Sequence, residues 1–153
     1  MIVWLEDRRD TVVALLPMFA RKNLEYQMLG KPATFVNFLD EMSDKIIGEG
    51  RQPVFLIDIM MHGVSDLSEI GLLNAPTMSG NHAGYVFVDR YLRSADSKWS
   101  NVPVCFLTER EIDEQLVEDV KHLNDRGPAP AKVFSKYHES KAEEMLALIE
   151  SWQ

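Results

Sequence analysis

Acidic, hydroxyl and amino side chains follow four short apolar runs in this sequence. Glu6 and Asp7 come directly after IVWL, and Asp58 comes directly after VFLI. Thr108 follows VPVCFL, and Lys136 follows AKVFS. If these runs are strands of one parallel sheet, their carboxyl ends meet at the same edge and bring the five side chains together. The sequence therefore predicts a functional site at that edge.

This set of side chains suits the handling of a divalent cation and a phosphoryl group. Three converging carboxylates repel one another, and near neutral pH at least one would hold a proton unless a cation compensates. Oxygen ligands suit Mg²⁺, whereas no Cys/His pair has the spacing of a zinc site. A carboxylate beside such a cation can attack phosphorus. A lysine and a hydroxyl would then stabilise the phosphoryl oxygens.

Each of these side chains alone also has an ordinary structural explanation. Asp7 or Asp10 would cap the next helix, Thr108 would cap the helix that follows it, and Lys136 would be an exposed loop lysine. We prefer a shared site because helix caps alone do not predict all five side chains at one edge. Four further titratable residues are interpreted as surface or packing residues, namely His62, His82, His122 and His138.

The apolar runs and the segments between them predict alternating strands and helices. The expected strands are Ile2–Leu5, Leu24–Leu29, Val54–Ile57, Val102–Leu107 and Val133–Phe134. Helical spacing of apolar residues predicts helices over Thr11–Lys22, Phe35–Ile46, Tyr85–Leu92, Ile112–Leu123 and Met145–Trp152. This alternation is typical of an α/β fold with a parallel sheet. We expect Asp58 to end a buried strand and to be exposed at the sheet edge.

One segment, Val64–Gly84, interrupts this alternation with a stretch rich in Gly, Ser, Asn and Pro. It is longer than most loops in a compact domain. A tolerated surface insertion and a flap over Asp58 explain it equally well.

Composition limits the classes of protein to consider. The chain has 153 residues, enough for one domain with a sizeable core. Its net charge of −8 argues against a nucleic-acid-binding protein. Cys105 is the single cysteine, so no internal disulfide forms and a reducing compartment fits best. Because no apolar run has the length of a signal peptide core or a membrane span, we expect a cytoplasmic protein without membrane contact.

Over essentially its whole length the chain resembles the receiver domain of bacterial two-component response regulators. IVWLEDR resembles the first strand with its acidic pair, and VFLIDIMMHG the phosphoacceptor strand with its turn. VPVCFLTE resembles the strand with the hydroxyl residue, and AKVFSKY the strand with the lysine. The resemblance implies a flavodoxin-like, doubly wound, five-stranded parallel sheet of order 2-1-3-4-5 with about five helices. It implies one domain over residues 1–153, with an insertion at about 64–84.

The resemblance also implies roles for individual residues. Asp58 is expected to accept the phosphoryl group. Glu6, Asp7 and Asp58 are expected to bind Mg²⁺, with the backbone carbonyl of Met60 as a further ligand. Thr108 is expected to sense the phosphoryl group.

Lys136 is expected to sense the phosphoryl group as well, and Val133 occupies the position of the aromatic switch residue. Several positions depart from the family pattern. His62 and Tyr137 stand where proline is usual, and Glu109 stands where a small residue is usual. A carboxylate at Glu109 would hinder access of phosphate to the pocket. The departures make the usual switch between threonine and an aromatic residue doubtful here.

The resemblance implies a response regulator that takes a phosphoryl group from a sensor histidine kinase or phosphotransfer protein. We expect no enzymatic activity beyond its own phosphorylation and dephosphorylation, with Mg²⁺ as the cofactor. Since the last predicted helix reaches Gln153, we expect no output domain and a signal passed to a downstream protein partner. The surface formed by Glu111–Leu123, Val133 and the last helix is the expected contact.

Two other functions fit parts of the pattern. A pseudo-receiver that binds proteins without being phosphorylated is favoured by Glu109, Val133 and the long Val64–Gly84 segment. A phosphatase of the haloacid dehalogenase type would need an acid two residues after the nucleophile, and that position is Met60. We therefore rank the phosphatase last. The sequence leaves the kinase, the signal and the oligomeric state open.

Overall fold

A five-stranded parallel sheet forms the centre of the computed structural model, which describes residues 1–50 and 52–153. The strands lie in the order β2-β1-β3-β4-β5, and each neighbouring pair is parallel. Their bounds are β1 (Ile2–Leu5), β2 (Tyr26–Leu29), β3 (Val54–Asp58), β4 (Val104–Thr108) and β5 (Ala131–Ser135). The flavodoxin-like strand order predicted above is confirmed. All of β1, β3 and β4 is buried, as the lack of alternation in these runs indicated.

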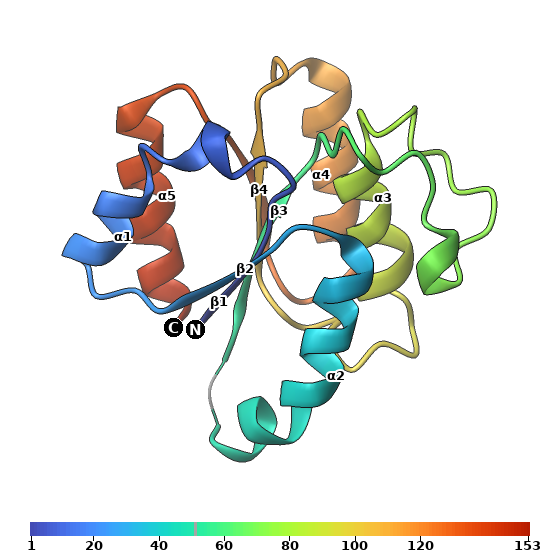
Figure 1. Ribbon diagram of the computed structural model, residues 1–153, viewed down its shortest axis with the longest axis horizontal. Helices are drawn as coiled ribbons and strands as arrows, with labels where there is room; N and C mark the ends of the chain where they lie inside the picture. The colour runs from blue at the N-terminus through green and yellow to red at the C-terminus, as the bar shows by residue number, and fades with distance from the viewer. Residues whose placement is uncertain (51) are drawn as a thin grey trace.

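Helices cover both faces of the sheet (Figure 1). They are α1 (Leu16–Arg21), α2 (Pro32–Gly48), α3 (Ala83–Phe87), α4 (Glu114–Arg126) and α5 (Glu139–Trp152). Figure 1 shows α1 and α5 on one face and α2, α3 and α4 on the other. The π-helical turn η3 (Val88–Leu92) continues α3. None of the helices described is long and apolar enough to cross a membrane.

The alternation of side chains along β1 and β3 separates two apolar cores. Trp4 and Leu56 belong to the core that also contains side chains of α1 and α5. The residues next to them along each strand pack into the core of α2, α3 and α4. Because alternate residues of a strand face the same side, Glu6 and Asp58 continue the side of Trp4 and Leu56. The two acids therefore point toward the chain that leads into α1.

The first helical segment is shorter than the sequence predicted. The expected helix over Thr11–Lys22 is divided into a 3₁₀ turn, η1 (Arg9–Val12), and α1. Pro17 lies in the first turn of α1. Backbone N–H groups there have no acceptor within the helix, so the lack of an N–H in proline removes no helical hydrogen bond. The predicted cap at Asp10 is wrong, because its carboxylate instead pairs with Arg8 at 3.1 Å.

The alternative explanation of Thr108 as a helix cap is excluded. Thr108 is the last residue of β4, and the N-cap of α4 is Asp113. The Asp113 carboxylate accepts a hydrogen bond from Leu116 N at 2.8 Å, which satisfies a donor of the first helical turn.

The long segment between β3 and α3 is anchored on the core. Val64 and Leu67 are buried in the core of α2, α3 and α4. The 3₁₀ turn η2 (Ser68–Ile70) contacts α2, and Met61 N donates to Gly80 O at 3.0 Å. Figure 1 shows the segment extending past α3, to the side of the sheet. This placement favours a surface insertion over a flap.

The start of α3 packs tightly against the end of β3. Gly84 N donates to Ile59 O at 3.1 Å. A Cβ atom at Gly84 would lie 1.9 Å from the carbonyl oxygen of Asp58 and 2.8 Å from its carbonyl carbon. Only glycine allows this approach, so Gly84 helps to hold the backbone of Asp58 in place.

We predict that Gly84→Ala lowers the free energy of unfolding by about 2–3 kcal/mol, because backbone must move to admit the methyl group. Gly48→Ala is the matched control, since a Cβ there meets no atom within 4 Å. It should leave stability unchanged or raise it by up to about 1 kcal/mol. Urea unfolding of the three proteins measures the effect. Equal stability of the two variants would contradict this packing.

Candidate functional site

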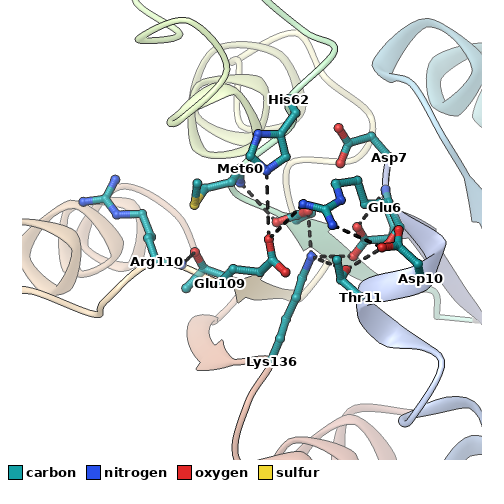
Figure 2. A network of polar contacts seen from close by, with 12 residues as sticks. Glu6, Asp7, Asp10, Thr11, Met60, His62, Glu109, Arg110 and Lys136 are labelled. Atoms are coloured by element: carbon teal, nitrogen blue, oxygen red, sulfur yellow. Dashed lines mark hydrogen bonds and ion pairs between the residues drawn. The ribbon is translucent and has the colours of Figure 1, made fainter.

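A lysine ammonium lies between two buried carboxylates at the carboxyl edge of the sheet (Figure 2). Lys136 Nζ is 2.7 Å from Asp58 Oδ2 and 2.8 Å from Glu6 Oε2. Asp58 is only 2% exposed and Glu6 is fully buried, so the prediction of an exposed Asp58 is wrong. The error has a physical reason, because an ammonium that pairs with a carboxylate offsets much of the cost of burying it.

Backbone and side-chain hydrogen bonds hold the ammonium in place. Lys136 N donates to Thr108 O at 3.0 Å, which fixes the chain after β5 against the end of β4. Lys136 Nζ also donates to Thr11 Oγ1 at 3.2 Å. Sequence reasoning missed Thr11, since it lies within a predicted helix and becomes part of the site only because η1 folds over the end of β1. The structure thus brings Lys136, Asp58 and Glu6 together as predicted.

Asp7 completes a cluster of three carboxylates that can bind a cation. One oxygen from each of Glu6, Asp7 and Asp58 lies within 4.8 Å of the others. Asp7 Oδ2 accepts a hydrogen bond from Gly63 N at 3.4 Å, whereas Oδ1 is buried and has no hydrogen-bond donor among the residues described. A buried carboxylate oxygen without a donor is costly. An all-oxygen set with one unsatisfied oxygen fits Mg²⁺.

Met60 contributes its backbone N–H to the cluster. This N–H donates to Asp58 Oδ1 at 3.1 Å, so both oxygens of Asp58 have a partner. The predicted role of the Met60 carbonyl as a metal ligand stays a prediction.

The site holds more negative than positive charge. Burial raises the pKa of Asp58 to about 8, and repulsion from Glu6 adds to this effect, while Lys136 opposes it. Burial by itself would lower the pKa of Lys136, but Asp58 and Glu6 outweigh it and raise this pKa. The ammonium therefore stays charged, and Asp58 is the group whose proton responds to a cation or a change of pH.

Among the residues described, neither Thr108 in β4 nor Val133 in β5 makes a hydrogen bond to the side chains of the cluster. The Thr108 hydroxyl is buried and accepts a hydrogen bond from Arg110 N at 3.1 Å. In the described part of the chain no hydrogen bond joins this hydroxyl to Asp58 or Lys136. Val133 pairs with Phe106 in the sheet and is half-buried. Their predicted roles in sensing and switching stay predictions.

Glu109 contacts side chains from three loops beside the site, and its approach to His62 is seen in Figure 2. Its Oε2 is 3.8 Å from Arg8 Nη1 and 3.9 Å from His62 Nε2. Its Oε1 accepts a hydrogen bond from Tyr137 Oη at 3.1 Å. Sequence reasoning predicted that Glu109 would hinder access to the pocket but missed Arg8 as its partner. His62 and Tyr137, which depart from the family pattern, are its other two contacts.

Comparisons with known proteins find similarity in structure only. No protein-family model and no curated protein matches this sequence. A two-component response regulator from Legionella pneumophila is 16% identical with a TM-score of 0.55, over 98% of this chain and 97% of that chain. The N-terminal domain of a response regulator receiver protein from Methanoculleus marisnigri JR1 is 15% identical with a TM-score of 0.51, over 97% and 93%.

The receiver domain of NtrX from Brucella abortus is also similar. It is 12% identical to this chain with a TM-score of 0.51, over 99% of this chain and 96% of that chain. The chain therefore has the fold of response regulator receiver domains along nearly its whole length. At these identities the likeness concerns the fold, and the chemistry must be argued from the site.

Asp58→Asn tests the raised pKa of Asp58. The carboxyl ionises near 3.8 in the unfolded chain and near 8 in the folded protein. Between these values the folded state holds a proton that the unfolded state has released, so wild-type stability falls as pH rises. Without divalent cations, the wild type should lose at least about 1.4 kcal/mol more than Asp58→Asn from about pH 5 to about pH 8, the equivalent of one pKa unit.

Urea unfolding in EDTA measures this difference. The control is Asp96→Asn, which removes an exposed acid in the connection between η3 and β4. It should follow the wild type at every pH. Parallel pH profiles for wild type and Asp58→Asn would show that the pKa of Asp58 is not raised.

Proposed function

We propose that this chain is a response regulator receiver that accepts a phosphoryl group on Asp58. The observation that carries the proposal is the contact of Lys136 Nζ with Asp58 Oδ2 at 2.7 Å, beside three clustered carboxylates. The likeness in fold to receiver domains supports it. The donor would be a phosphohistidine of a sensor histidine kinase or a phosphotransfer protein.

The side chains present can perform this transfer. An Asp58 carboxylate oxygen forms a bond to phosphorus while the bond from phosphorus to the donor nitrogen breaks, and the histidine nitrogen keeps the electron pair. Lys136 stabilises the negative charge on the phosphoryl oxygens. Glu6, Asp7 and Asp58 would hold Mg²⁺, which neutralises carboxylate and phosphoryl charge when bound. Thr108 lies at the end of the neighbouring strand and would donate its hydroxyl to a phosphoryl oxygen after a change of rotamer.

The proposed activity is limited to the protein's own aspartate. The chain would catalyse its phosphorylation and the later hydrolysis of the aspartyl phosphate, without turnover of another substrate. A cytoplasmic location is part of the proposal, since the proposed phosphodonor would have to reach Asp58 there.

A groove on one side of the molecule offers a contact for a downstream protein. It has a volume of about 520 Å³ and lies between the loop that joins β4 to α4, β5 and the start of α5. Ile112, Val133 and Phe134 line it together with acidic and basic side chains. Tyr137 on its rim is 67% exposed. The mixture of an apolar floor and a charged rim is typical of protein interfaces.

A pseudo-receiver that binds proteins without being phosphorylated is the second candidate. The contacts of Glu109 at the mouth of the site favour it, because a carboxylate there repels an incoming phosphate. The intact Lys136 and carboxylate cluster favour the phosphorylated receiver, since a binding module has no need of these buried charges.

Phosphorylation itself separates the two candidates. Incubation with Mg²⁺ and acetyl phosphate should add one phosphoryl group, measured as intact mass. Asp58→Asn should abolish the adduct because the nucleophilic oxygen is lost, and EDTA should abolish it in the wild type. Asp96→Asn should behave like the wild type. If the wild type forms no adduct and does not bind beryllofluoride in excess Mg²⁺, the phosphorylated receiver is excluded. The pseudo-receiver is then the remaining candidate.

A further inference from the structure

The contacts of Glu109 all come from loops that also carry the proposed phosphorylation site. Arg8 lies two residues after Glu6, His62 lies four residues after Asp58, and Tyr137 follows Lys136 directly. Glu109 itself follows Thr108, the last residue of β4. One carboxylate therefore connects the loops after β1, β3, β4 and β5 above the buried cluster.

The contacts that hold Glu109 between these loops are weak. The two ion-pair distances, 3.8 Å to Arg8 and 3.9 Å to His62, are long, and Tyr137 Oη provides the one short contact at 3.1 Å. Arg8 is also shared with Asp10, to which it donates at 3.1 Å. Partly exposed ion pairs of this kind stabilise little, so a stronger anion at the same place would displace the Glu109 carboxylate.

We propose that Glu109 is an anionic gate over Asp58, an inference that rests on the proposed phosphorylation of Asp58. In the unphosphorylated protein its charge slows the approach of anionic phosphodonors. Once the phosphoryl group is on Asp58, its oxygens repel Glu109 and attract Arg8. The gate then opens and the hydrogen bond from Tyr137 is lost.

Opening of the gate would change the groove proposed for the downstream partner. Glu109 and Tyr137 both line this groove, together with Val133. Val133 has no aromatic ring that could change its position on phosphorylation. Release of the exposed ring of Tyr137 from Glu109 gives the chain another way to connect the state of Asp58 with this surface. Tyr137 is thus the proposed readout, and Glu109 determines when it is released.

Phosphorylation rates of Glu109 variants test the gate. Glu109→Gln keeps an acceptor for Tyr137 but removes the charge, and Glu109→Ala removes both. With acetyl phosphate, from which acetate leaves with the electron pair of the broken P–O bond, both variants should form the Asp58 adduct at least about tenfold faster than the wild type. Phosphoramidate carries less negative charge than acetyl phosphate. With phosphoramidate as the donor, both variants should therefore be faster than the wild type by about threefold or less. A purely structural role of Glu109 would not distinguish the two donors.

Glu41→Gln is the matched control, because it removes the same charge from an exposed position of α2, outside the site and the groove. Its rates should equal those of the wild type. Equal rates for wild type and Glu109→Gln, or equal acceleration by Glu109→Gln and Glu41→Gln, would overturn the gate and leave the proposed function intact. An adduct in the Glu109 variants alone would support the gate. No adduct in any variant would overturn the proposed function, and the gate with it.

Fluorine NMR of fluorotyrosine-labelled protein tests the release of Tyr137. The chain has four tyrosines, and the resonance missing from Tyr137→Phe identifies Tyr137. Beryllofluoride with Mg²⁺ should shift this resonance in the wild type. Glu109→Ala should show it already shifted in the same direction. A resonance that moves with neither treatment would overturn Tyr137 as the readout.

Discussion

The contact of one lysine ammonium with two buried carboxylates determines most of what this structure can do. Lys136 offsets only part of the charge of Glu6 and Asp58, and the half-buried Asp7 adds another carboxylate at the same edge. Burial raises the pKa of Asp58 to about 8, and repulsion from Glu6 adds to this effect. A divalent cation bound by these carboxylates would offset this excess of negative charge, and the proposed chemistry needs Asp58 to remain accessible to a phosphoryl group.

The fold explains why these charges meet. Parallel strands direct their carboxyl ends to one edge, and the alternation of side chains places Glu6 and Asp58 on the same face. Gly84 lets the start of α3 approach the carbonyl of Asp58. The chain after β5 is fastened to β4 through Lys136 N. Three residues that depart from the receiver pattern also meet at this edge, namely His62, Glu109 and Tyr137. Because Glu109 contacts the other two, they form a single structural feature.

Much of this was predictable from the sequence, and the failures have physical causes. The apolar runs predicted the strands because burial on both faces needs unbroken hydrophobic residues. The meeting of the acids and the lysine was also predicted, because the carboxyl ends of parallel strands lie at one edge of the sheet. Burial of Asp58 was missed although Lys136 was expected at the same edge, because the direct pairing of its ammonium with the Asp58 carboxylate, which offsets the cost of burial, cannot be read from the local sequence. Thr11 and the contacts of Glu109 were missed for the same reason, since loop side chains meet through tertiary folding that no local pattern encodes.

The central claim is that the three carboxylates form an oxygen site completed by a divalent cation. The most direct measurement is a Mg²⁺ titration followed by the backbone amide resonances of Met60 and Gly63, which donate to Asp58 and Asp7. The account predicts saturable shifts of both resonances with one cation bound, and much weaker binding for Asp7→Asn. Resonances that do not move, or identical titrations for wild type and Asp7→Asn, would contradict it.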